Sequence, residues 1–139
     1  MHDTFSDRNI ENVIELNRQI VGKRNENFGL SDHAKFYDIF RNVNGFSSVV
    51  DPKIRVTKKA STLLSGIVWG QPFKNGNKAT GTVITKYFLR KNGYFFPLET
   101  DAKEREYFNL LERTVLKFEG DLTIYSEIED YLLKNVIRV

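Results

Sequence analysis

Two helix-forming stretches joined by a short turn constrain the fold of this chain most. Over residues 57–70 the apolar side chains recur at helical spacing, so one side of this stretch is expected to be strongly buried. The turn at residues 71–77 is rich in Gly and Asn, and residues 78–92 form a second predicted helix that closes on Gly93. The spacing therefore predicts two consecutive helices joined by a tight turn, with the first of them buried on one side.

Four further segments have caps and apolar spacing that predict helices. They are residues 6–21, 31–43, 102–119 and 126–137. The expected fold class is therefore all-α, a single compact domain over residues 1–139 with about six helices and little or no strand. Residues 46–55, which contain Val49 and Val50, are expected to be irregular or to form a short extended flap.

Composition bounds the class of protein. A chain of 139 residues with 40% hydrophobic content fits one globular domain. The absence of cysteine excludes disulfides, thiolate zinc sites and cysteine nucleophiles. No apolar run reaches the length of a membrane helix, and the first residues lack a secretion signal, so we expect a cytoplasmic protein without a membrane partner.

Positive charge is concentrated between residues 51 and 93, which carry nine basic side chains and one acid, although the whole chain has a net charge of only +3. The basic residues are Lys53, Arg55, Lys58, Lys59, Lys74, Lys78, Lys86, Arg90 and Lys91. They are either solvated helix faces balanced by acids nearby in space, or a field that gathers nucleotide, nucleic acid or an acidic protein. Charge alone does not choose between the two.

The turn before the second central helix has the composition of an anion site. Backbone N–H groups of a Gly/Asn turn and of a first helical turn form a concave site that suits phosphate. Lys78 adds a mobile positive charge at the same place. A plain capped turn between two helices has the same composition, so this segment alone leaves both interpretations open.

Residues 71–79 read Gln-Pro-Phe-Lys-Asn-Gly-Asn-Lys-Ala, which resembles the loop signature of the Fic/Doc (Fido) family, His-x-Phe-x-acid-Gly-Asn-Gly/Lys-Arg. The Asn-Lys ending is closest to that of the death-on-curing (Doc) toxins. Flanking segments are also similar to the family, namely residues 14–17, 29–32, 59–64 and 87–93. The resemblance spans most of the chain and is weakest after about residue 99.

This resemblance implies a Fido-type helical domain with the motif loop between its two central helices. Family members transfer part of a nucleotide to protein hydroxyls, and most of them transfer AMP. Doc transfers a phosphate to elongation factor Tu as the toxin of a toxin–antitoxin pair. The implied cofactors are ATP and Mg²⁺, and the implied partners are a nucleotide, a protein target and an antitoxin.

Three positions depart from the family pattern. Gln71 stands at the position of the histidine that acts as general base, and an amide has no usable basicity near neutral pH. Asn75 stands at the acidic, metal-binding position and offers Mg²⁺ only a neutral oxygen, which binds more weakly than a carboxylate. Ala79 stands at the arginine that clamps the distal phosphates and has no donor.

The binding half of the motif is retained. Gly76, Asn77 and Lys78 match the family residues that hold the nucleotide phosphates, and Phe73 matches the buried aromatic residue that anchors the loop. The only histidines, His2 and His33, lie outside the motif.

The leading hypothesis is a catalytically impaired Doc-like domain that keeps a phosphate or nucleotide site and possibly a toxin–antitoxin or protein-binding role. The first alternative is an active transferase whose base is supplied from elsewhere, by a carboxylate or by His33. The second alternative is a nucleic-acid-binding module that uses the basic segment. It is the least favoured, because a helical protein without an aromatic-interleaved basic surface is expected.

Overall fold

The structure is a computed structural model that describes residues 3–139. Its elements in chain order are α1 (Asp7–Lys23), α2 (His33–Asn44), the short 3₁₀ helix η1 (Gly45–Ser48), α3 (Pro52–Gly70), α4 (Asn77–Lys91), β1 (Tyr94–Phe95), α5 (Asp101–Val115), α6 (Thr123–Asn135) and β2 (Ile137–Arg138). The predicted all-α class is confirmed, since only two-residue strands accompany the helices. None of the described helices is long and apolar enough to cross a membrane.

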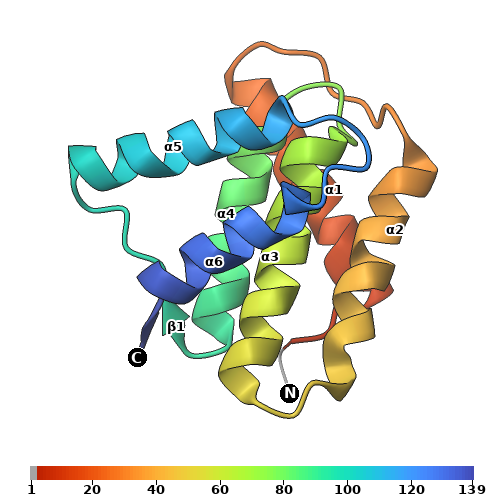
Figure 1. The fold of residues 1–139 in the computed structure, drawn as a ribbon. Coiled ribbons are helices and arrows are strands. Elements are labelled where there is room, and N and C mark those ends of the chain that lie inside the picture. The colour runs from red at the N-terminus through yellow and green to blue at the C-terminus, as the bar shows by residue number, and fades with distance from the viewer. Residues whose placement is uncertain (1–2) are drawn as a thin grey trace.

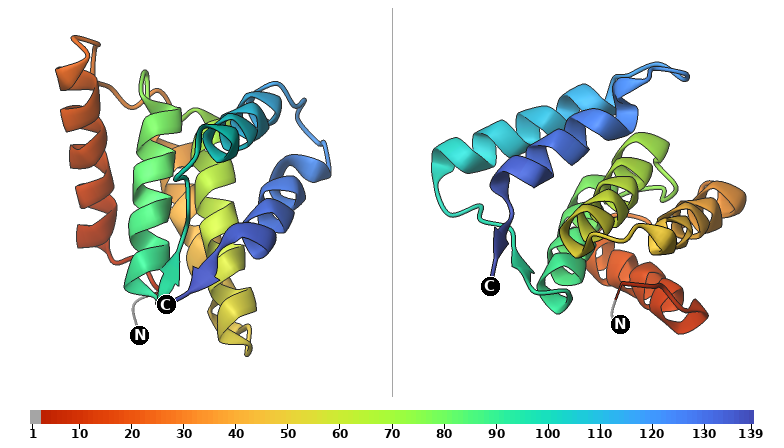
Figure 2. Two further views of the ribbon diagram at one scale, coloured as in Figure 1. Left: turned by 90° about the vertical axis from the view of Figure 1, so that its left-hand side faces the viewer. Right: turned by 60° about the horizontal axis from the view of Figure 1, so that its bottom comes forward.

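Helix α3 is the central element, and its two flanks carry the other helices (Figure 1). The antiparallel neighbour α4 packs along it, with α1 and α2 on one side and α5 and α6 on the other (Figure 2). The α3–α4 loop lies at one end of this pair, and the first described residues before α1 and the C-terminus lie near the opposite end. Because α3 contacts helices on several sides, most of its residues after Val56 are buried.

The start of α3 differs from the sequence expectation. The helix begins at Pro52 rather than near residue 57, because the Asp51 side chain caps the Ile54 N–H at 3.0 Å and proline suits the first helical position. The residues before it form η1, and Val50 is 88% exposed in the short connection. An extended flap over residues 46–55 is therefore wrong, since only about three residues separate the two helical segments.

The C-terminal helices also shift. Helix α5 ends at Val115, four residues before the predicted end, and α6 starts at Thr123, three residues before the predicted start. Beyond α6, β2 pairs antiparallel with β1 in the register Tyr94 to Arg138 and Phe95 to Ile137. This pairing fastens the end of the described chain beside the last turn of α4 (Figure 2).

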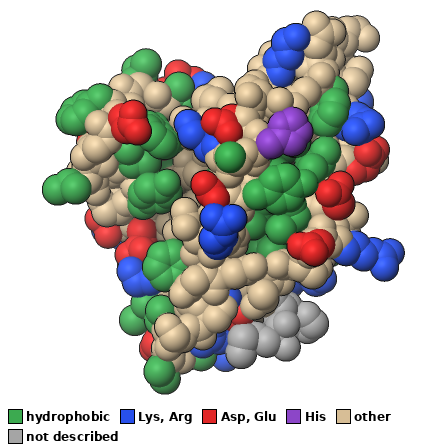
Figure 3. Space-filling view, turned by 90° about the vertical axis from the view of Figure 1, so that its right-hand side faces the viewer, with side chains coloured by type: hydrophobic (Ala, Val, Ile, Leu, Met, Phe, Trp, Pro, Cys, Tyr) green, Lys and Arg blue, Asp and Glu red, His purple; other side chains and the backbone are tan. Residues whose placement is uncertain are grey.

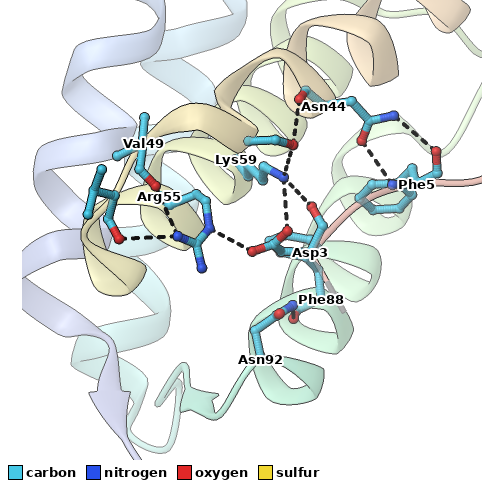
Figure 4. A network of polar contacts seen from close by, with 10 residues as sticks. Asp3, Phe5, Asn44, Val49, Arg55, Lys59, Phe88 and Asn92 are labelled. Atoms are coloured by element: carbon cyan, nitrogen blue, oxygen red, sulfur yellow. Dashed lines mark hydrogen bonds and ion pairs between the residues drawn. The ribbon is translucent and has the colours of Figure 1, made fainter. Parts of the chain in front are cut away.

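A buried ion cluster fastens the N-terminal segment to α3 (Figure 4). Lys59 is fully buried, and its Nζ donates to the Asp3 carboxylate at 3.0 Å, to the Asp3 carbonyl at 2.6 Å and to Ser47 Oγ at 2.9 Å. The Arg55 guanidinium donates to the second Asp3 oxygen at 2.8 Å and to the Val49 carbonyl at 2.9 Å. One carboxylate therefore balances two cations of the basic segment.

Candidate functional site

The α3–α4 loop is closed by backbone geometry and by a second loop. Gln71 ends α3 in the left-handed conformation, with φ of 50°, and Gly76 precedes α4 with φ of 77°. The segment before α2 binds the loop from outside. The Ser31 N–H donates to the Pro72 carbonyl and the Lys74 N–H to the Gly29 carbonyl, both at 2.8 Å.

Phe73 fixes the middle of the loop in the core. Its side chain is 1% exposed, and its ring packs edge-on against Phe36 of α2 with centroids 5.2 Å apart. A fully buried aromatic ring in a loop sets the position of its backbone neighbours, because removing the ring from its socket would expose a large apolar area. The loop therefore presents its polar groups from a fixed platform.

The Asn77 side chain ties the loop to the first turn of α4. Its Nδ2 donates to the Phe73 carbonyl at 2.8 Å and to Gln71 Oε1 at 3.1 Å, and its Oδ1 accepts from the Phe73 N–H at 3.0 Å. The Gln71 Nε2 in turn donates to the Val68 carbonyl at 2.6 Å. Both polar atoms of the Gln71 side chain are therefore engaged within the loop, and the Asn77 amide is directed inward.

Asn17 of α1 is a loop-holding residue that sequence reasoning missed. It is fully buried, and its Nδ2 donates to the Asn75 carbonyl at 2.9 Å and to Thr80 Oγ1 at 3.0 Å. A Cβ at Gly76 would lie 2.9 Å from Val21 Cγ1 and 3.1 Å from Asn17 Nδ2, so only glycine fits there. Asn17 ends the segment 14–17 that resembles the family, but its contact with the loop could not be predicted, because it lies some sixty residues away in the chain.

The first turn of α4 offers free donors. Within residues 3–139, the backbone N–H groups of Asn77, Lys78 and Ala79 have no hydrogen-bond partner, and the first bond of the helix is from Thr80 N–H to the Gly76 carbonyl at 2.9 Å. Unpaired N–H groups at a helix start, aligned with the positive end of the helix dipole, form an anion site. The three sequence-predicted phosphate residues, Gly76, Asn77 and Lys78, thus come together at one helix end.

Lys78 is paired with an acidic residue at this helix end. Its Nζ forms an ion pair with Glu112 of α5, and both side chains are partly exposed, at 37% and 60%. The acid lies thirty-four residues away in the sequence, so only the packing of α5 over the start of α4 reveals it. An incoming anion would compete with Glu112 for the lysine charge.

The three altered motif positions lie around the same helix end. Gln71 is exposed at its rim, and Ala79 is half-buried in the first turn of α4. Asn75 donates through Nδ2 to the Asn27 carbonyl at 2.9 Å, which leaves Oδ1 as its one available oxygen. Among the described residues, no group of three His, Cys, Asp or Glu side chains is placed to hold a metal ion.

The alternative base considered from the sequence lies apart from the loop contacts. His33, the first residue of α2, is exposed, and a histidine is visible at the surface on the side of the molecule that carries α2 (Figure 3). The hydrogen-bond partners of the Gln71 side chain are Val68 and Asn77, not His33. His2 lies outside the described residues.

The basic segment is divided by the fold. Four of its nine cations form ion pairs, namely Arg55 and Lys59 with Asp3, Lys58 with Glu129, and Lys78 with Glu112. Lys59 is inaccessible to any ligand because it is fully buried. Part of the positive charge is thus balanced by acids brought close in space, as the first interpretation of the charge pattern expects, and the remaining five cations form no ion pair within residues 3–139.

Comparison with known proteins agrees with the arrangement of helices and loop. The family model described as "Fic/DOC family" matches residues 7–89, which is more than half of the chain. The matched span runs from the start of α1 to the last turns of α4 and includes the whole α3–α4 loop. No curated protein and no solved structure matches the chain. The buried central helix, the Phe73-anchored loop and the matched span together show that the chain belongs to the Fic/DOC family.

Proposed function

We propose that this Fic/DOC member is a divergent, Doc-like domain that binds the phosphates of a nucleotide such as ATP at the start of α4 but is impaired in transferring them. Its partners in this proposal are the nucleotide and a protein, either a target or an antitoxin, in the cytoplasm. The observation that carries the proposal is the contrast between free backbone donors and an occupied Gln71 side chain.

Binding is supported by the groups that remain available. The N–H groups of Asn77, Lys78 and Ala79 point out of the helix start, and backbone donors survive any change of side chain. Asn77 contributes its backbone N–H to the ligand, since its side chain is already hydrogen-bonded to the loop backbone at Phe73. Lys78 supplies the positive charge once a phosphate displaces Glu112.

Impaired transfer is supported by the chemistry at Gln71. A side-chain amide does not accept a proton near neutral pH, and both of its polar atoms are already hydrogen-bonded. Loss of a positioned general base lowers a rate by about a hundredfold to ten-thousandfold. Ala79 adds to the loss, because it offers no side-chain donor to the charge that develops on a transferring phosphate.

The residues present do not fit a resident Mg²⁺. Among the altered motif positions only Asn75 offers a side-chain oxygen, and this oxygen is neutral. The Glu112 carboxylate contacts the motif through Lys78 and is paired with that lysine. Hard cations prefer charged oxygen ligands, so a magnesium ion would have to be held mainly by the nucleotide itself. The proposal therefore derives binding from the helix start and Lys78 alone.

An active transferase with a substituted base is the second candidate, and Glu112 is the observation that bears on it. The Glu112 carboxylate forms an ion pair with Lys78, the lysine of the motif. Because it is bonded to Lys78 and not to Gln71, it lowers the charge available to phosphate in the observed arrangement. We therefore treat Glu112 as a competitor of the ligand.

Calorimetric titration with ATP tests the binding site. Lys78→Ala is expected to weaken binding about fivefold to tenfold, because one close charge contact is lost. Glu112→Gln is expected to strengthen it by a few-fold, because the competing carboxylate becomes neutral. Lys86→Ala, an exposed lysine two turns further along α4, is the matched control and should leave affinity unchanged. Equal affinity of Lys78→Ala and wild type would refute the site.

Label transfer into lysate proteins tests the chemistry, with ATP labelled at the γ- or the α-phosphate in parallel reactions. The proposal expects little or no transfer by the wild type and a gain in the Gln71→His variant, which restores a titratable base. Strong γ-label transfer by the wild type would instead identify a Doc-like kinase. Strong α-label transfer would identify an AMP transferase.

A further inference from the structure

The far end of α4 bounds a second surface feature, distinct from the motif loop. A groove of about 940 Å³ lies between the last two turns of α4 and the β1–β2 ribbon. Lys86 is the groove residue nearest the motif loop along α4 and is eight residues from Lys78, which separates the groove from the anion site by roughly 12 Å. The groove is lined by Lys86, Tyr87, Arg90, Gly93, Tyr94, Phe95, Phe96, Ile137 and Val139.

Large apolar side chains are exposed along this groove. Tyr87 is 57% exposed, Phe95 41% and Ile137 54%. Neighbouring exposed aromatic and aliphatic side chains on one surface are typical of interaction sites. Beneath them, the buried Phe96 packs edge-on against Tyr107 and Tyr131 of the core. The apolar floor is thus a fixed surface.

The rim of the groove is positive. Lys86 and Arg90 line it, and the Lys91 Nζ lies 5.4 Å from the centroid of the Tyr87 ring. None of these three cations pairs with a carboxylate among the described residues. Helix α4 itself contains no acidic residue. In contrast to Lys78, these charges are uncompensated and remain available to an acidic partner.

The backbone favours an extended occupant. The sheet consists of β1 and β2 only, so the outer edge of β2 has no partner strand within residues 3–139. Unpaired strand edges accept an extended peptide, with alternate side chains directed to either face. A nucleic acid fits less well, because the walls between the cations are mainly apolar and offer few donors to successive phosphates.

We propose that this groove binds a short, extended, acidic segment of a partner protein, with an aromatic or branched aliphatic side chain of that segment against Phe95 and Ile137. Its carboxylates are neutralised by Lys86 and Arg90 in the groove and by Lys91 beside Tyr87. Steering by these charges speeds encounter, and burial of the apolar side chain slows release.

A random-peptide library displayed on phage and selected on the full chain supplies the probe. The proposal expects enriched peptides to carry several Asp or Glu residues around one aromatic or aliphatic residue. A selection that returns no binders, or binders without acidic enrichment, would overturn it. Single-stranded poly(U) RNA is the competing probe. If poly(U) bound this surface more tightly than the selected peptides, the groove would be a nucleic-acid site and the proposal would be overturned.

Fluorescence anisotropy with one selected peptide then maps the groove. The double variant Lys86→Glu, Arg90→Glu is expected to weaken binding at least about tenfold, since both contacts become repulsive. Phe95→Ala should weaken peptide binding several-fold by removing the apolar contact. If the charge reversal disturbs folding, the Phe95→Ala variant alone tests whether the peptide binds in the groove. Lys78→Ala is the control and should have no effect, whether or not it alters ATP binding. Unchanged binding in either groove variant would place the peptide elsewhere.

Discussion

Two buried polar clusters hold distant segments of this domain together, and they do so with different chemistry. The first joins Asp3 to Arg55 and Lys59 by ion pairs beneath the N-terminal segment (Figure 4). The second joins the α3–α4 loop to α4 and α1 through the neutral amides of Asn77 and Asn17. Both clusters join distant segments, although Asn17 Oδ1 in the second cluster is buried without a hydrogen-bond partner among residues 3–139. Only the first cluster contains titrating groups.

The difference determines how each cluster fails. An ion cluster leaves a buried, uncompensated charge when one partner is removed, which costs far more than a lost neutral hydrogen bond. Burial raises the pKa of Asp3, but hydrogen bonds from Arg55 and Lys59 more than offset it, so that the pKa lies below its ordinary value of 3.8. An amide cluster loses only individual hydrogen bonds and does not respond to pH.

The largest expected effect is that of Asp3→Ala. This change leaves Lys59 fully buried without a counter-charge, so we expect the free energy of unfolding to fall by about 3–5 kcal/mol. Urea unfolding followed by circular dichroism measures it. Asp130→Ala, an exposed acid of α6, should cost less than about 0.5 kcal/mol. A loss below about 1 kcal/mol for Asp3→Ala would show that water reaches the lysine.

Asn77→Ala is expected to cost less, about 2–4 kcal/mol. It removes three hydrogen bonds and leaves the Phe73 N–H and carbonyl buried without these partners. The same unfolding measurement applies, with Asn12→Ala, an exposed amide of α1, as the control of near-zero effect. If both variants unfolded alike, the amide would not hold the loop.

Gly76→Ala is expected to cost about 2 kcal/mol. Part of this arises from the positive φ and part from a Cβ 2.9 Å from Val21 Cγ1. Gly93→Ala separates the two contributions, because Gly93 has φ of 88° and no atom within 4 Å of the added Cβ. We expect about 1 kcal/mol there, measured as the shift in urea midpoint. If both variants lost the same free energy of unfolding, the contact with Val21 would contribute nothing to the cost at Gly76.

The smallest effect is the pH dependence of the ion cluster. A carboxyl whose pKa is lowered by folding contributes stability above its unfolded pKa and loses it as the pH falls through its folded pKa. The stability gap between wild type and Asp3→Asn should therefore narrow on acidification below the ordinary range of Asp, by at most about 1.4 kcal/mol per pH unit. Unfolding curves measured between neutral and acidic pH would show a constant gap if Asp3 were not the titrating group.

The prediction of helices from sequence succeeded where apolar spacing is long and regular, as in α3 and α4. It placed the start of α3 five residues late, because the Asp51 cap and Pro52 were not read as a helix start. It left residues 46–55 as irregular or as a short extended flap, whereas they contain the end of η1, a short connection with Val49 and Val50, and the start of α3. Helix ends depend on caps and packing more than on periodicity.

The candidate site also has a part that could be predicted from the sequence and a part that could not. The positions of Gln71, Phe73, Gly76, Asn77 and Lys78 on one turn could be predicted, because they are adjacent in the chain. The partners of those residues could not. Asn17, Asn27 and Glu112 reach the loop only through the packing of other segments.

By itself, then, the sequence determined the helical class, the loop between two central helices and the resemblance to the Fic/DOC family, since local spacing and turn residues carry that information. Only the tertiary structure decided that Lys59 is buried in an ion cluster and that Lys78 is balanced by Glu112. It also decided that Lys86, Arg90 and Lys91 form no ion pair within the part of the chain that the structure describes. The physical reason is that charge and hydrogen bonding act over a few ångströms in space. Residues brought that close by packing can be far apart in the chain.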